Sequence, residues 1–149
     1  MTLTVTIASC SQGPATNSGI PDSLWNDAVT DTLKPIGFLP DEPNPPPVHL
    51  ISAYREGDIV GAWRLLEIRN DGMEIVIQYS QGGICDTDKG VIVAETSTEV
   101  AIVPVYRNPT MPCNSTAVLL TPSGVVTLDK PLGDRKLLHI PGDNTLPTP

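Results

Sequence analysis

Three cysteines carry the chemistry that this 149-residue sequence offers most clearly. Cys10 ends an apolar N-terminal run, whereas Cys85 and Cys113 lie far downstream, each beside strand-like segments. None of them belongs to a CxxC motif, so their spacing favours neither a zinc ribbon nor a thioredoxin-type redox pair. An odd number of cysteines in an exported chain leaves one thiol with a separate fate. We therefore expect a Cys85–Cys113 disulfide and a modified Cys10.

The residues before Cys10 indicate which modification that is. Ile7-Ala8-Ser9-Cys10 resembles a bacterial lipobox, in which the cysteine receives diacylglycerol. Residues 1–21 are thus predicted to be a signal-like segment with a flexible polar tether, and Cys10 a lipidation site. The alternative is a first strand over residues 2–8 with a buried cysteine at its end. The first interpretation places the protein outside the cytoplasm, anchored to the cell membrane by lipid or secreted.

The negative charge of the chain argues against nucleic acid as a partner. Seventeen Asp and Glu stand against nine Lys and Arg, which gives a formal net charge of −8. Such a chain repels nucleic-acid phosphates, and no basic stripe with interleaved aromatic residues offsets this. No run reaches the roughly 18–20 apolar residues of a membrane-spanning helix. We expect no nucleic-acid binding, and membrane attachment only through the lipid anchor.

One helix and one spacer are predicted before the body of the protein. Residues 22–34 place Leu24, Trp25, Ala28, Val29 and Leu33 at helical spacing, between Pro21 and Pro35. Residues 35–47 hold six prolines in thirteen positions. Proline lacks a backbone donor and fixes φ, so this run predicts an extended, semi-rigid spacer.

From residue 48 onward the apolar pattern changes to period two. Seven or eight short strands are predicted at roughly ten-residue spacing, with turn signals between them. The Asn70-Asp71-Gly72 turn is typical of a hairpin, and Pro104 indicates a strand with a free edge or a bulge. We expect a mainly β domain over residues 48–140, either a small antiparallel β-sandwich or a partly open barrel, followed by a disordered tail over 141–149.

Catalytic chemistry finds little support in the sequence. The two histidines, His49 and His139, both fall on strand patterns, and no Gly-x-Ser-x-Gly elbow is present. Asp86-Thr87-Asp88 begins like a calcium loop, but no glutamate closes it. Glu95 and Glu99 flank a hairpin tip and are expected to face water. We predict no catalytic residue, no metal site and no cofactor, and lean against an enzyme.

One polar motif remains as a candidate ligand-binding site. Gly133-Asp134-Arg135 follows a predicted strand, and Asp134 with Arg135 could recognise an anionic ligand. The competing interpretation is structural: Asp134 accepts backbone donors in a turn and Arg135 pairs with a nearby carboxylate.

The second half of the chain resembles a known family. Gly83-Ile84-Cys85-Asp86, the strand pair leading to Cys113, and the run from Val126 to Arg135 are similar to a recurrent β domain of exported actinobacterial proteins of unknown function. The resemblance implies a small β module with paired cysteines behind a lipoprotein or secretory signal. It implies no activity.

These observations favour a binding module of the cell envelope. We expect a monomeric, exported and lipid-anchored β domain that binds an envelope protein or a small ligand without catalysis. Two alternatives stay open: a small hydrolase whose site the sequence does not reveal, and an accessory subunit of an envelope complex.

Overall fold

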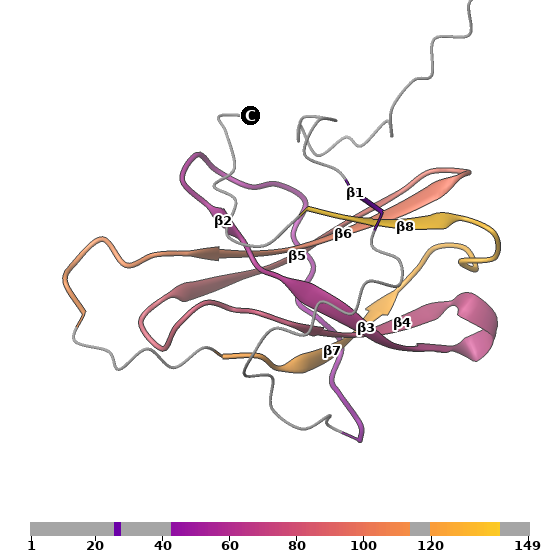
Figure 1. Ribbon diagram of the computed structural model, residues 1–149, viewed down its shortest axis with the longest axis horizontal. Coiled ribbons are helices and arrows are strands. Elements are labelled where there is room, and N and C mark those ends of the chain that lie inside the picture. The colour runs from indigo at the N-terminus through magenta and orange to yellow at the C-terminus, as the bar shows by residue number, and fades with distance from the viewer. Residues whose placement is uncertain (1–25, 28–42, 114–119, 141–149) are drawn as a thin grey trace, which may run out of the picture.

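The computed structural model describes residues 26–27, 43–113 and 120–140, and these form a mainly β structure of two packed sheets (Figure 1). The first sheet, sheet A, has the order β1-β8-β6-β2, with β5 on the other side of β6. Sheet B has the order β3-β4-β7. The predicted β class is confirmed, and the two sheets do not close into a barrel.

The strands have the following bounds: β1 Asn26–Asp27, β2 Ile59–Val60, β3 Trp63–Arg69, β4 Glu74–Tyr79, β5 Thr87–Glu95, β6 Glu99–Arg107, β7 Ser123–Thr127 and β8 Lys136–His139. A 3-10 turn, η2, spans Asn70–Gly72 between β3 and β4. All strand pairs are antiparallel except β6 with β8, which is parallel.

The helix predicted over residues 22–34 is not confirmed. Only Asn26 and Asp27 of that stretch lie among the described residues, and they form the short strand β1 against Leu138 and His139. Backbone pairing with a sheet edge therefore replaces helical hydrogen bonds at these two positions. Cys10, the tether, the first part of the proline-rich spacer and the tail over 141–149 lie outside the described residues. Within the described ranges, no helix has the length and apolar character needed to cross a bilayer.

The β3–β4 hairpin forms as the sequence indicates. Asn70, Asp71 and Gly72 have φ of 50°, 52° and 89°, the left-handed region that Asn, Asp and Gly tolerate best. The N–H of Met73 donates to the carbonyl of Asn70 at 3.0 Å and closes the turn.

Pro104 lies where a residue without a backbone N–H can be accommodated in β6. β8 pairs with the start of β6 at residues 99–101, and β2 pairs with its end at 105–106. Pro104 lies between these two stretches, where the missing N–H interrupts no strand ladder, and its carbonyl accepts the N–H of Gly61 at 2.9 Å. The sequence predicted a free edge or a bulge at this proline; the structure has instead a gap between two partner strands of β6, β8 and β2.

The predicted strand over residues 48–54 is replaced by a strap, residues 46–51, that pairs with both sheets. The N–H of Val48 donates to Val125 of β7 at 3.0 Å, and three residues later the N–H of Ile51 donates to Val91 of β5 at 3.0 Å. Both contacts are isolated parallel bridges. Because the prolines of residues 45–47 cannot donate to a continuous ladder, the strap crosses from one sheet to the other.

Sheet A has apolar side chains on both faces. Alternate residues of β5 and β6, such as Val91 and Ile102, enter the core between the sheets. Their neighbours, such as Ile92 and Val103, form a second buried cluster with Tyr54 and others. Since successive side chains of a strand point to opposite faces, this second cluster lies on the far face of sheet A. The near-continuous apolar sequence of β6 follows from this double burial.

Candidate functional site

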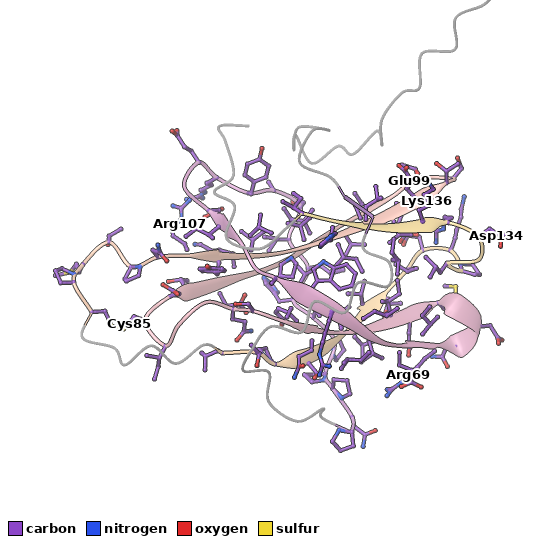
Figure 2. All side chains as sticks on the ribbon, in the orientation of Figure 1. Arg69, Cys85, Glu99, Arg107, Asp134 and Lys136 are labelled. Atoms are coloured by element: carbon purple, nitrogen blue, oxygen red, sulfur yellow. A yellow bond between two sulfur atoms is a disulfide. The ribbon has the colours of Figure 1, made fainter. Side chains whose placement is uncertain are left out.

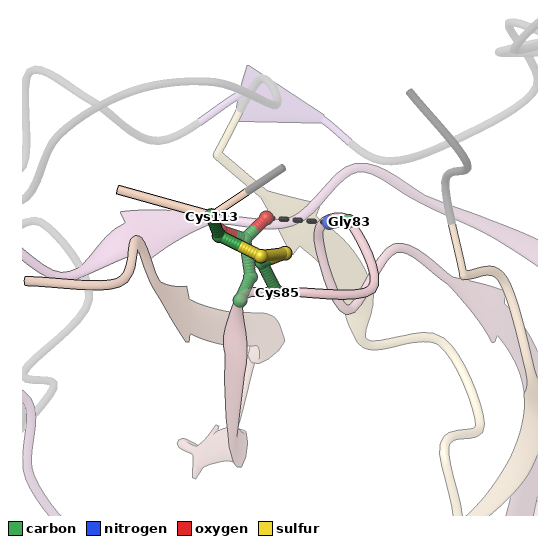
Figure 3. Close-up of a disulfide and its surroundings, with 4 residues drawn as sticks. Gly83, Cys85 and Cys113 are labelled. Carbon is green, nitrogen blue, oxygen red and sulfur yellow. Dashed lines mark hydrogen bonds between the residues drawn. A yellow bond between two sulfur atoms is a disulfide. The ribbon is translucent and has the colours of Figure 1, made fainter. Parts of the chain in front are cut away.

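The disulfide predicted from the sequence is present. Cys85 lies in the loop between β4 and β5, Cys113 lies in the loop after β6, and their Cα atoms are 6.1 Å apart (Figure 3). This separation falls in the range that a disulfide spans. The loop that carries Cys85 is itself a tight turn, in which the Asp86 carboxylate accepts the N–H of Gly83 and the N–H of Asp86 donates to the Gly83 carbonyl at 2.9 Å. The bridge thus joins two loops at one end of the sandwich.

Gly82 allows that loop to approach the sheet. Its φ is +81°, and a Cβ placed there would lie 2.4 Å from Oδ2 of Asp86 and 2.6 Å from Cδ2 of Tyr106. Both contacts are shorter than real Cβ atoms tolerate, so a side chain at this position would push the cysteine loop away from β6.

A polar cluster lies beside the disulfide loop. Nε2 of Gln81 donates to Asp88 at 2.7 Å and lies 3.5 Å from the Tyr79 hydroxyl. The other carboxylate oxygen of Asp88 accepts the N–H of Gly90 at 3.0 Å. Burial, and secondly the Asp88 charge, raise the pKa of Tyr79, while the hydrogen bond from Gln81 opposes them. Both oxygens of Asp88 thus have protein partners. Among the described residues, no three His, Cys, Asp or Glu side chains gather closely enough to hold a metal ion.

Exposed apolar side chains surround the disulfide. Ile84, Met111 and Leu120 are all exposed, and they make up half of the exposed large apolar residues in the described part of the chain. Leu120 is fixed beside the disulfide loop by backbone hydrogen bonds with Gln81 and Gly82, both at 2.9 Å. We call this region, formed by residues 81–86, 109–113 and Leu120, the cystine end. It is an exposed apolar surface braced by a covalent bond.

The opposite end of the sandwich is organised by Arg135. Figure 2 shows Asp134, Glu99 and Lys136 at that end, far from Cys85. Nη1 of Arg135 donates to the Glu95 carboxylate at 2.8 Å, and the pair is nearly buried, with side-chain exposures of 9% and 16%. The other N–H groups of the guanidinium donate to the carbonyls of Thr96, Lys130, Pro131 and Leu132. All five N–H groups of Arg135 therefore have partners inside the protein.

Glu95 completes this arrangement, which we call the arginine end (residues 95–99 and 129–136). Its second oxygen accepts the N–H of Asp129 at 2.7 Å. The expectation that Glu95 faces water is therefore wrong: the carboxylate turns toward the loop over residues 129–135 because the Arg135 guanidinium and the Asp129 N–H both donate to it there. The structural interpretation of Arg135, a pair with a nearby carboxylate, is confirmed. Asp134 is exposed, and its binding of a ligand stays a prediction.

A second ion pair fixes β6 to the turn before β2. Asp58 is almost fully buried. It accepts Nε of Arg107 at 2.6 Å and the N–H of Arg55 at 2.7 Å. The sequence marks residues 55–58 as a polar turn, but nothing in it pairs Asp58 with an arginine 49 residues away. Like the Arg135 pair, this one supports the fold.

The two histidines lie apart from both ends. His139 is half-buried with its ring edge-to-face with Trp63, at 6.4 Å between centroids. Burial lowers the pKa of His139. His49 lies on the strap and is exposed. His139 is held by packing, and His49 by its place on the strap.

The comparisons with known proteins return nothing for this chain: no protein-family model, no curated protein and no solved structure matches it. The resemblance to the exported actinobacterial domain, and the lipidation of Cys10, stay predictions. The disulfide and the contrast between the two ends are the features that bear on function.

Proposed function

We propose that this protein is an exported, lipid-anchored β module that binds an envelope protein or a small ligand and catalyses no reaction. The observation that carries the proposal is the Cys85–Cys113 disulfide, with its Cα atoms 6.1 Å apart. Disulfides persist in oxidising compartments and are rare in reducing cytoplasm. The lipobox-like residues that end at Cys10 supply the anchor.

The cystine end is the surface that we assign to binding. Its apolar side chains, Ile84, Met111 and Leu120, stand in water in the described structure. Exposed apolar groups that gather at one place mark sites of contact with other molecules. The arginine end supports this choice by contrast, because its central cation is fully occupied within the protein.

Intact mass spectrometry of the full chain from its native host tests the compartment and the anchor. We expect a gain of about two daltons on reduction, one for each sulfur that takes up a hydrogen, and an added diacylglycerol mass that Cys10→Ser removes. Free thiols at Cys85 and Cys113 in freshly isolated protein would contradict export. An unmodified Cys10 on a disulfide-bonded chain would leave export standing and refute the anchor alone.

Variants at the two ends test the binding surface. Ile84→Asp and Met111→Asp place charges on the cystine end, whereas Lys136→Glu reverses a charge on the arginine end. All three side chains are exposed, so the fold should survive. After crosslinking on intact cells, a partner captured by the native chain should be lost with the first two variants and retained with the third. Equal loss with Lys136→Glu would move the binding surface away from the cystine end.

A further inference from the structure

The edge of β3 that faces away from β4 carries a self-complementary pattern of charged and apolar side chains. β3 is the edge strand of sheet B, since it pairs with β4 alone among the described strands. Leu65 and Ile68 lie opposite Ile77 and Ile75 of β4, so both point to the core side of the sheet. Nevertheless they are 41% and 46% exposed. The sandwich is therefore open along this edge.

The outward face of the same strand is charged. Glu67 and Arg69 lie opposite Val76 and Glu74 of β4, on the side away from the core. They form an exposed ion pair with 2.6 Å between Nε of Arg69 and Oε2 of Glu67. An edge strand presents its unpaired backbone groups to any extended chain, and a second edge can complete the ladder.

We propose that β3 pairs antiparallel with β3 of a second copy of this chain, with Ile68 on the two-fold axis. In this register, Glu67 of each copy faces Arg69 of the other, and the two Ile68 side chains meet on the core side. Centring the pair on Glu67 would instead set two carboxylates opposite each other, which is unfavourable. The charge pattern thus selects one register, and the dimer replaces the monomer expected from the sequence.

The bulge in β3 limits the length of the strand that can pair with the second copy. The register between β3 and β4 shifts between Leu65 and Glu67, so the regular edge runs only from Glu67 to the hairpin turn at Asn70. A short isologous contact of this kind uses the β3 edge of both copies, so it joins two copies at this edge and no more. The interface is smaller than that of standard stable complexes, which makes the dimer weak and dependent on concentration.

Charge reversal tests the register directly, with sedimentation equilibrium of the disulfide-bonded chain as the measurement. Glu67→Arg sets two arginines opposite each other at both contacts, and Arg69→Glu sets two glutamates there. Each variant should weaken self-association about tenfold or more. An equimolar mixture of the two variants should associate again as a heterodimer, and so should the double variant Glu67→Arg/Arg69→Glu alone.

The fold itself should persist, because an exposed ion pair contributes at most about 1 kcal/mol. Lys136→Glu, a charge reversal on β8, is the matched control and should leave the dimer unchanged. The proposal is overturned if the native chain stays monomeric up to about millimolar concentration. It is equally overturned if the dimer forms and neither reversal weakens it, or if the mixture fails to restore association, since each result excludes the Ile68-centred register.

Discussion

The cystine end and the arginine end solve the same structural problem with different chemistry. Each must hold two loops that are distant in sequence against the edge of a small sandwich. At the cystine end a covalent bond joins Cys85 to Cys113, and the surrounding apolar side chains are free to face water. At the arginine end Arg135 uses every donor it has to hold its own loop and Glu95. A covalent brace leaves side chains available for binding, whereas a hydrogen-bonded brace consumes them.

The largest effect should come from removing the arginine brace. Arg135→Ala leaves the Glu95 carboxylate nearly buried without its cation, and it frees the carbonyls of residues 130–132. Breaking such a pair costs about 3–5 kcal/mol, to be measured by urea unfolding of the disulfide-bonded protein. The double variant Glu95→Gln/Arg135→Ala should recover part of the loss. A cost below about 1 kcal/mol would show that the guanidinium does not brace this end.

Removing the covalent brace should cost slightly less. The disulfide closes a ring of about 29 residues, which corresponds to about 3–4 kcal/mol on the chain-entropy model. Cys85→Ser/Cys113→Ser should lower the free energy of unfolding by this amount, and reduction of the native chain should reproduce it. Addition of 1 M salt should leave the difference unchanged. A strong dependence on salt would indicate that charges, and not the covalent bond, hold the cystine end.

Two glycines extend the contrast between the two ends to the backbone. Gly82→Ala should lower the free energy of unfolding by about 3 kcal/mol. The added methyl group would contact Asp86 and Tyr106 too closely, and alanine also disfavours the positive φ at this position. Gly133→Ala at the arginine end has φ of +51° but only one neighbour at 4.0 Å, so it should cost about 1 kcal/mol. Urea unfolding measures both. Equal costs would mean that the disulfide loop adapts to an added side chain.

The smallest expected effect is the pH dependence of stability that His139 contributes, in the body between the two ends. Burial lowers the pKa of His139 below its ordinary value of 6.5, so the unfolded chain binds a proton more readily than the native one. Stability should therefore fall as the pH drops below 6.5, through this group. His139→Gln should flatten the dependence in that window, as measured by unfolding at pH 5 and pH 7. Arg135→Ala should leave this part of the profile unchanged.

Local patterns in the sequence predicted most of the β structure. Apolar residues between turn signals located β3, β4, β6 and β8, whether one face of the strand is buried, as in β3, or both, as in β6. The turn at residues 70–72 was predicted because Asn, Asp and Gly tolerate its backbone angles. The strap was missed because its two contacts are single bridges to different sheets, and neither leaves a repeating signal. The strand β1 was missed because its partner, β8, follows more than a hundred residues later.

The candidate site, too, was predicted only in part from the sequence. The cysteine count predicted the Cys85–Cys113 bridge, since compartment and parity are properties of the whole sequence. The role of Glu95 was not predictable, because the carboxylate finds Arg135 only when the β5–β6 hairpin and the loop before β8 come together. Asp58 and Arg107 meet for the same reason. Long-range ion pairs depend on the assembled topology, which residue spacing does not encode.

The strap gives the module a particular response to mechanical load. Residues 46–51 connect whatever precedes Pro43 to both sheets, through bridges to Val125 on one and Val91 on the other. A pull from the N-terminal side that has separated β1 from β8 thus does not go on to peel a second outer strand. It is divided between both layers of the sandwich before it reaches either core.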